Sequence, residues 1–180
     1  MDFKMIPYEG MQESSSINSL AERGAQIANT RSSKLFLLKR LYSFVLAEIA
    51  YFCPINSIRI WCHRQRGVKI GKHVHIGLHC VLDYSYPEYI TLEDYVTLSG
   101  EVYVLTHSRP RENFRGKLLS YIAPVHIKKG AWLTVRTTVL PGAVVGEDSV
   151  ISAGAMVTGD IPDHSMAAGN PAVVERSLNR

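Results

Sequence analysis

Residues 127–157 read IKKGAW LTVRTT VLPGAV VGEDSV ISAGAM V when they are written in groups of six. Each group opens with a large aliphatic residue, and each complete group carries a small residue in its fifth position. The aliphatic series is Ile127, Leu133, Val139, Val145, Ile151 and Val157, and the small series is Ala131, Thr137, Ala143, Ser149 and Ala155. Neither a helix of 3.6 residues per turn nor an alternating strand has a period of six. The period predicts a solenoid of short parallel strands, with one strand and one corner per group.

The same spacing occurs earlier in the chain, in two shorter series. These are Ile70, Ile76 and Leu82, followed by Leu92, Leu98 and Val104. Three groups of six close one triangular coil of eighteen residues, so residues 127–144 and 145–162 form two complete coils. We expect the aliphatic side chains to point inward and the small ones to lie inside near the corners. The predicted fold is an all-β solenoid over residues 67–165.

Composition and charge fit one globular domain of 180 residues, 46% hydrophobic and 20% charged. The net charge of +4 comes from the N-terminal third, because residues 31–66 hold seven Lys or Arg and the single acid Glu48. The remainder is balanced, which argues against nucleic acid as a partner. Three cysteines without a CxxC pair exclude a disulfide framework and favour reduced thiols in the cytoplasm.

The N-terminal part divides into a flexible arm, residues 1–30, and an amphipathic helical segment, residues 31–66. Its apolar stripe consists of Leu37, Leu38, Leu41, Val45, Ile49 and Phe52, and Pro54 ends it. One interpretation is a helix that covers the end of the solenoid. The other is peripheral contact of residues 33–53 with anionic lipid at the inner membrane face, through Lys34, Lys39 and Arg40. We expect no signal peptide and no transmembrane span, since Lys39, Arg40 and Glu48 interrupt the apolar run.

Three further motifs accompany the repeats: Lys69-Ile70-Gly71, Lys129-Gly130-Ala131-Trp132-Leu133 and Ala168-Gly169-Asn170-Pro171-Ala172. With the repeats, they resemble the hexapeptide-repeat acetyltransferases, and among these the maltose, galactoside, nodulation-factor and colanic-acid type sugar O-acetyltransferases. The resemblance implies a left-handed parallel β-helix, a homotrimer, acetyl-CoA as co-substrate and no metal. The final residues, 166–180, are expected to form a C-terminal segment.

The six-residue register breaks between Val104 and Ile127, where a protruding loop, residues 106–124, is too long for a corner. The loop carries Arg109, Arg111, Arg115 and Lys117. His107 stands at its root, and a histidine in this place is the catalytic base of the family that the chain resembles. Imidazole suits the task, because it accepts a proton near neutral pH and can return it.

A second break follows Leu82, where four extra residues precede Leu92. The resemblance implies an acidic residue here that faces the acceptor, and Asp83 matches it. Asp83 could hold a sugar hydroxyl or orient His107, and an exposed turn acid without a role is the alternative. Tyr84 is expected to stack on a sugar ring.

The cofactor side is likewise implied by the resemblance. Family members bind the pantetheine arm in a groove between subunits, and the matching positions are Val135, Ala153 and Thr158. Trp132 would be an apolar wall of the groove or a packing residue, and Arg176 would meet a phosphate. Thr134 and Gly159 depart from the family pattern, so Lys128, Lys129 or Arg136 could supply positive charge in place of the missing basic residue.

The predicted function is an acetyl-CoA-dependent O-acetyltransferase acting on a sugar or polysaccharide precursor. An amino-sugar or antibiotic acetyltransferase and a non-catalytic scaffold are alternatives. A γ-type carbonic anhydrase uses the same fold but needs two histidines about five residues apart. Between His79 and His164 this chain offers only His107 and His126, nineteen apart.

Overall fold

The computed structural model describes residues 4–5, 33–108, 114 and 121–179, with the main chain only for 4–5 and 33–36. The predicted flexible arm therefore lies outside the described residues, apart from strand β1 (Lys4–Met5). The loop cations Arg109, Arg111, Arg115 and Lys117 also lie outside them.

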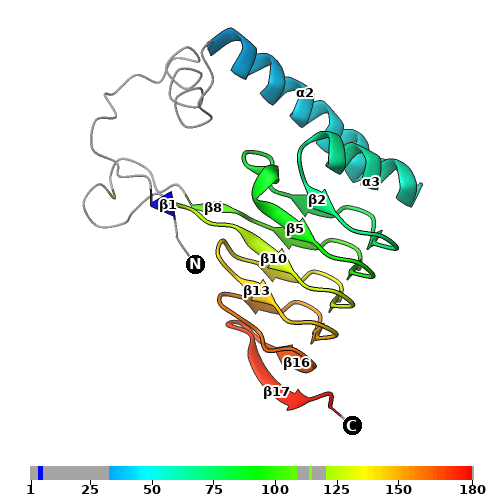
Figure 1. The fold of residues 1–180 in the computed structure, drawn as a ribbon, viewed down its shortest axis with the longest axis vertical. Helices are drawn as coiled ribbons and strands as arrows, with labels where there is room; N and C mark the ends of the chain where they lie inside the picture. The colour runs from blue at the N-terminus through cyan, green and yellow to red at the C-terminus, as the bar shows by residue number, and fades with distance from the viewer. Residues whose placement is uncertain (1–3, 6–32, 109–113, 115–120, 180) are drawn as a thin grey trace.

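The described chain forms two helices followed by a stack of parallel coils (Figure 1). Face 1 of the coil contains β2 (Lys69–Ile70), β5 (Ile90–Leu92), β10 (Val125–Ile127) and β13 (Val144–Val145). Face 2 contains β3 (His75–Ile76), β6 (Thr97–Leu98), β11 (Trp132–Leu133), β14 (Val150–Ile151), β16 (Ser165–Ala168) and β17 (Val173–Ser177). Face 3 contains β4 (Val81–Leu82), β7 (Tyr103–Val104), β12 (Thr138–Val139) and β15 (Met156–Val157). We call the turns from face 1 to 2, from 2 to 3 and from 3 to 1 the first, second and third corners.

The strand register confirms the predicted period. Ile127 pairs with Val145, Leu133 with Ile151 and Val139 with Val157, each eighteen residues later. In the first coil the partners are 22 residues apart, as in Ile70 with Leu92, and in the next they are 35 apart, as in Leu92 with Ile127. The excess over eighteen is 22 − 18 = 4 residues at the first register break and 35 − 18 = 17 residues at the second. Each break is therefore an insertion into an otherwise regular coil.

The core is a single column of aliphatic side chains inside the coil. All six members of the sequence series from Ile127 to Val157 have no exposed surface. The small residues of the second series are buried with them, at 0–1% exposed. Because the interior is this narrow, only a small side chain fits beside each corner, as the sequence predicted.

The helical segment consists of α2 (Ser33–Phe52) and α3 (Asn56–Gln65), and Pro54 lies in the break between them. Both helices lie at the N-terminal end of the stack (Figure 1). Arg64 donates to the carbonyl of Ile70 on face 1, Arg59 to that of Ile76 on face 2, and Arg66 to that of Leu82 on face 3. Arginines thus cap the open edge of each face, which would otherwise expose unpaired main-chain groups. Three of the seven basic residues in residues 31–66 thus serve the fold itself.

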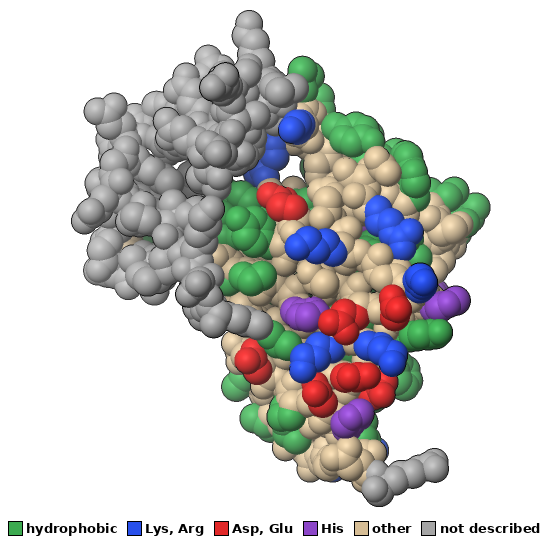
Figure 2. All heavy atoms as spheres, in the orientation of Figure 1, with side chains coloured by type: hydrophobic (Ala, Val, Ile, Leu, Met, Phe, Trp, Pro, Cys, Tyr) green, Lys and Arg blue, Asp and Glu red, His purple; other side chains and the backbone are tan. Residues whose placement is uncertain are grey.

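The predicted apolar stripe of α2 is wrong in its direction. Leu38, Leu41 and Phe52 are 60–67% exposed, whereas the buried residues of the helix are Leu46, Ala47 and Ala50. Both faces of the helix are apolar, so the period of the apolar residues could not tell which face packs against the protein. Figure 2 shows hydrophobic side chains along the edge where α2 and α3 lie.

No helix within the described residues is long and apolar enough to cross a membrane. Peripheral contact of residues 33–53 with lipid stays a prediction.

Two features differ from the predicted boundaries. Strand β16 adds to face 2 across the predicted limit at residue 165, and β17 pairs antiparallel with it, so the C-terminal segment extends this sheet. At the loop root, β8 (His107–Ser108) pairs antiparallel with β9 (Tyr121–Ile122), which in turn pairs with β1. A three-stranded sheet therefore joins the two ends of the loop.

Candidate active site

Both register breaks emerge at the third corner. The first follows β4 and the second follows β7, and these strands are neighbours on face 3, where Leu82 pairs with Val104. Asp83 comes directly after Leu82, and His107 comes three residues after Val104. The coil thus brings the two insertions together, one above the other, and with them the predicted base and the predicted acid.

His107 and Asp83 are in direct contact. Nδ1 of His107 lies 2.7 Å from Oδ2 of Asp83. The imidazole is 32% exposed, whereas the carboxylate is 1% exposed. A neutral imidazole that donates its Nδ1–H to a carboxylate has an unprotonated Nε2, and that nitrogen can accept a proton from another molecule.

The carboxylate of Asp83 is held on both sides by the surrounding chain. Oδ1 accepts hydrogen bonds from the amides of Ser85 and Tyr86, at 2.7 and 3.1 Å. Oδ2 accepts from the amide and the hydroxyl of Thr106, at 2.8 and 2.9 Å, in addition to His107. Burial on its own raises the pKa of Asp83, but the hydrogen bonds from His107 and Thr106 outweigh it and hold the pKa below the usual 3.8.

Of the two roles expected for Asp83, the geometry favours orienting His107 over binding an acceptor hydroxyl, because the Asp83 side chain is 1% exposed. Its oxygens are turned inward and already accept five hydrogen bonds, so no acceptor hydroxyl reaches them. The alternative of an exposed turn acid is wrong for the same reason.

The aromatic residue next to the imidazole is Tyr86. Its ring meets that of His107 edge to face, with centroids 5.4 Å apart. The sequence analysis selected Tyr84, whose ring lies instead beside Phe44 and the guanidinium of Arg66, and whose hydroxyl donates to Glu48. Both tyrosines lie in the first register break, and nothing in the repeat pattern indicates which one turns toward His107.

Two of the predicted cofactor residues lie in one row across face 2. Trp132 pairs with Val150, Val150 with Met166, and Met166 with Arg176, on four successive strands. Trp132 is 47% exposed and Arg176 is exposed. At about 4.8 Å per strand, the main chains of the two residues are roughly 14 Å apart.

The other three cofactor residues lie at corners. Val135 and Ala153 are one coil apart at the second corner, where the amide of Gly154 donates to the carbonyl of Val135 at 3.0 Å. Thr158 follows β15 at the third corner. Val135, Ala153 and Thr158 are all exposed. Within one chain, face 3 separates Trp132, Val135 and Ala153 from His107.

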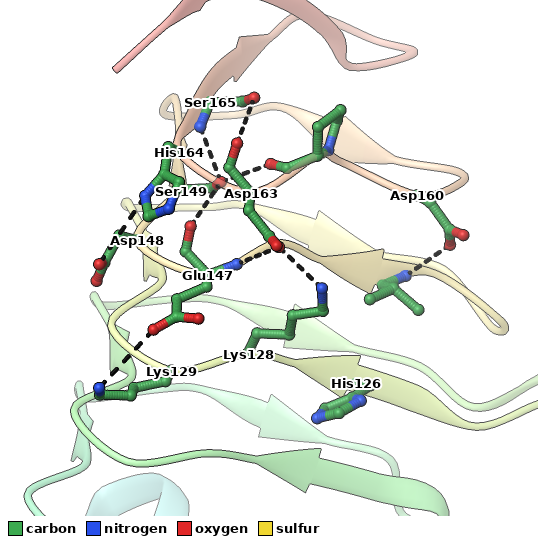
Figure 3. A network of polar contacts seen from close by, with 12 residues as sticks. His126, Lys128, Lys129, Glu147, Asp148, Ser149, Asp160, Asp163, His164 and Ser165 are labelled. Carbon is green, nitrogen blue, oxygen red and sulfur yellow. Dashed lines mark hydrogen bonds and ion pairs between the residues drawn. The ribbon is translucent and has the colours of Figure 1, made fainter. Parts of the chain in front are cut away.

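The cations proposed as substitutes for a missing phosphate partner are all in ion pairs. Lys128 bonds Asp163 at 2.8 Å and Lys129 approaches Glu147 at 3.8 Å, both at the first corner (Figure 3). Arg136 bonds Glu101 at 2.6 Å at the second corner. Opposite charges lie side by side on this surface in Figure 2. These three exposed pairs connect one coil with another, and exposed ion pairs contribute little to stability.

The remaining titratable groups do not gather into a metal centre. Across the described ranges, no three residues among His, Cys, Asp and Glu lie close enough to bind an ion. His126 faces a single acid, with Nε2 2.6 Å from Glu93. The three cysteines, Cys53, Cys62 and Cys80, are free thiols.

Comparison with known proteins gives the family. No protein-family model matches the chain. The chain is 31% identical over 145 residues to SACOL2570 of Staphylococcus aureus strain COL, a protein named as an acetyltransferase, covering 79% of this chain and 69% of that one. It is 34% identical over 118 residues to galactoside O-acetyltransferase of Lactococcus lactis subsp. lactis, covering 61% and 55%. The hexapeptide-repeat acetyltransferase VCA0836 of Vibrio cholerae, solved with acetyl-CoA, has a TM-score of 0.69 at 20% identity over 83% and 92%.

The chain belongs to the hexapeptide-repeat acetyltransferases. It is an acetyltransferase enzyme, and its coil is the left-handed parallel β-helix of that family.

Proposed function

We propose that this enzyme transfers the acetyl group of acetyl-CoA to a hydroxyl group of a sugar or a polysaccharide precursor, with His107 as the general base. The observation that carries the proposal is the 2.7 Å contact between His107 and the buried carboxylate of Asp83. The Lactococcus lactis relative is a galactoside O-acetyltransferase, which supports a sugar hydroxyl as the acceptor.

The reaction needs one proton to move twice. Asp83 accepts the Nδ1–H of His107, so the lone pair of Nε2 removes the proton of the acceptor hydroxyl as its oxygen attacks the thioester carbonyl. The tetrahedral intermediate then breaks the carbon–sulfur bond, and the imidazolium returns the proton from Nε2 to the leaving thiolate. The products are the acetyl ester and free CoA. Asp83 stays ionised throughout and stabilises the transient imidazolium.

The second corner and face 2 fit acetyl-CoA. Side chains at Val135 and Ala153 are exposed there, and the neighbouring Gly154 leaves open space, since a Cβ atom at this position would meet no atom within 4 Å. Main-chain groups at this corner would hold the pantetheine arm, with Trp132 as an apolar wall. Thr158 would supply a further main-chain contact to the pantetheine arm, and Arg176 would meet a phosphate.

A homotrimer would complete the site. In one chain the cofactor positions at the second corner and His107 at the third corner lie on opposite sides of face 3. Threefold packing would place the second corner of one subunit beside the third corner of the next. We also place the enzyme in the cytoplasm, because its three cysteines are free.

The test is an acceptor screen with acetyl-CoA, followed through release of free thiol. Galactosides, maltosides and larger oligosaccharides represent hydroxyl acceptors, and amino sugars and aminoglycosides represent amine acceptors. Thiol release with hydroxyl acceptors, lost in His107→Ala, would support the proposal. Release with amines alone would show an N-acetyltransferase, and release by none of them would contradict sugar acetylation.

A further inference from the structure

Arg66 is the C-cap residue of α3, and its guanidinium is buried against the turn that follows β4. Nη2 donates to the carbonyls of Leu82 and Asp83, at 3.0 and 2.7 Å. Nε donates to the hydroxyl of Ser43 on α2 at 3.2 Å, and Nη1 donates to Nδ1 of His63 at 2.9 Å. All three nitrogen atoms of the group are therefore engaged, and Arg66 is 6% exposed.

A buried guanidinium is stable only where acceptors replace its water. The carbonyls of Leu82 and Asp83 are two of the acceptors that do so. Because His63 and Ser43 belong to the helices, Arg66 fixes the main chain of Asp83 relative to α2 and α3. Asp83 is the residue whose carboxylate meets His107.

Side chains of α2 hold the rest of the same turn. Arg40 donates to the carbonyl of Ser85, and Glu48 accepts a hydrogen bond from the hydroxyl of Tyr84 at 3.1 Å. The helical segment thus contacts three consecutive residues of the first register break, beginning at Asp83. The coil holds the same turn from the other side, because the amide of Asp83 donates to the carbonyl of Val104 at 2.9 Å and the hydroxyl of Thr106 donates to the carbonyl of Tyr86 at 3.0 Å. The helices add the contacts to the carbonyls of Leu82, Asp83 and Ser85, which the coil leaves to them.

We propose that Arg66 is a positioning residue of the acetyltransferase: by holding the carbonyls of Leu82 and Asp83, it sets the place from which Asp83 orients His107. The inference rests on the proposed role of His107. It gives the N-terminal helices a function in the reaction besides covering the end of the coil. Displacement of the Asp83 carboxylate frees the imidazole to rotate and to carry its proton on Nε2, where it cannot act as a base.

Arg59 offers a matched control. It is 4% exposed, and it too donates to two main-chain carbonyls, those of Ile76 and Cys53, each at 2.6 Å. It caps face 2, on a side of the coil that holds neither register break. Arg59→Met and Arg66→Met therefore remove the same buried group from the same kind of site, and only the second contacts the turn of Asp83.

The experiment compares the full-length wild type, Arg66→Met and Arg59→Met by two readouts. The first is kcat and KM from thiol release with an acceptor found in the screen. The second is the ¹⁵N–¹H spectrum of the imidazoles, with the His107 signals assigned by their loss in His107→Ala. For Arg66→Met we expect kcat to fall about 10- to 100-fold with KM for acetyl-CoA unchanged. The Nδ1–H tautomer of His107 should give way to a mixture. Arg59→Met should lower the melting temperature and leave kcat and the tautomer unchanged.

The proposal is overturned if folded Arg66→Met keeps the wild-type kcat and the wild-type His107 tautomer, or if Arg59→Met changes both equally. Should the methionine variant fail to fold, Arg66→Lys gives the same test, because lysine keeps the charge but has one donor group in place of a fork. Failure of the proposed function has a different signature, namely full activity in His107→Ala. The tautomer readout does not depend on activity, so the two failures are distinguishable.

Discussion

Nδ1 of His107 lies 2.7 Å from Oδ2 of Asp83, although the two residues are 24 positions apart in the sequence. They meet because two successive coils each depart from the six-residue period at the third corner. Five hydrogen bonds fix the buried carboxylate of Asp83, and the imidazole of His107 is 32% exposed. The pair that we propose as base and orienting acid thus comes from two insertions and not from the regular coil.

Replacing His107 by alanine should lower kcat by about 10²- to 10⁴-fold, the usual contribution of a positioned general base. The melting temperature and the affinity for acetyl-CoA should stay close to wild type, because Asp83 keeps its four hydrogen bonds from Ser85, Tyr86 and Thr106. Thiol release, thermal melting and calorimetry measure the three quantities.

His126→Ala is the matched control for that variant. His126 is similarly exposed and also contacts one carboxylate, but it lies on face 1 beside Glu93. It should keep most of its activity. An inactive His126→Ala beside an active His107→Ala would show that the register break points to the wrong histidine.

Asp83→Asn should lower kcat by about 10²- to 10⁴-fold. It should also lower the melting temperature, because either orientation of the amide places its NH2 group against a main-chain N–H, that of Thr106 or those of Ser85 and Tyr86. The amide can donate a hydrogen bond to Nδ1, which leaves the proton of His107 on Nε2 and removes the base. Asp160→Asn serves as control, because Asp160 is an exposed residue that accepts from the amide of Val144 at 3.1 Å. Wild-type turnover in Asp83→Asn would contradict the orienting role of Asp83.

The coil and the root of the site could be predicted from the sequence because the coil is periodic. The distances from Leu82 to Leu92 and from Val104 to Ile127 already place both breaks at one corner, one coil apart. These two distances already predict that Asp83 and His107 lie close together. They favour the interpretation in which Asp83 orients His107 over the one in which it binds a sugar hydroxyl.

The parts that could not be predicted are those that no repeat constrains. The face of α2 that packs is the one with Ala47 and Ala50, which are buried. Because the helix is apolar on both faces, the spacing of its apolar residues does not tell which face is buried. The same holds for Tyr86 and Arg66. Their contacts with the base and the acid depend on the folded path of the first break and on the angle of α3.

We expect the enzyme to be a homotrimer in solution. Light scattering on a size-exclusion column should give about three times the chain mass of 20.1 kDa. The reason is that Trp132, Val135 and Ala153 lie on the other side of face 3 from His107, so a single chain does not form a complete site. A monomer that is fully active at micromolar concentration would disprove the trimer.

Ala143→Leu should destabilise the coil, because Ala143 has no exposed surface and lies inside the aliphatic column. Overpacking of a dense core costs about 1–3 kcal/mol. Glu147→Leu adds a similar side chain outside the coil, where the Glu147 side chain is 42% exposed, and should change little. Equal midpoints of urea unfolding in both variants would show that the inward and outward assignments are wrong.

Stability below neutral pH should depend on His63, which is 2% exposed and accepts a hydrogen bond from Arg66. Burial, and then the charges of Arg66 and Arg59, lower the pKa of His63 from 6.5 to about 3. Between these two values the unfolded chain binds a proton that the folded chain does not. The contribution of a neutral His63 to the free energy of unfolding is therefore complete above pH 6.5. This contribution decreases as the pH falls toward 3, by at most about 1.4 kcal/mol per pH unit.

In His63→Asn the amide oxygen keeps an acceptor near the position of Nδ1 and does not titrate. The free energy of unfolding of this variant, from urea unfolding between pH 4 and 8, should therefore depend less on pH than that of the wild type. His75→Asn, at an exposed position of β3, should keep the wild-type slope. If His63→Asn kept that slope as well, the buried imidazole would not be the group that takes up the proton on unfolding.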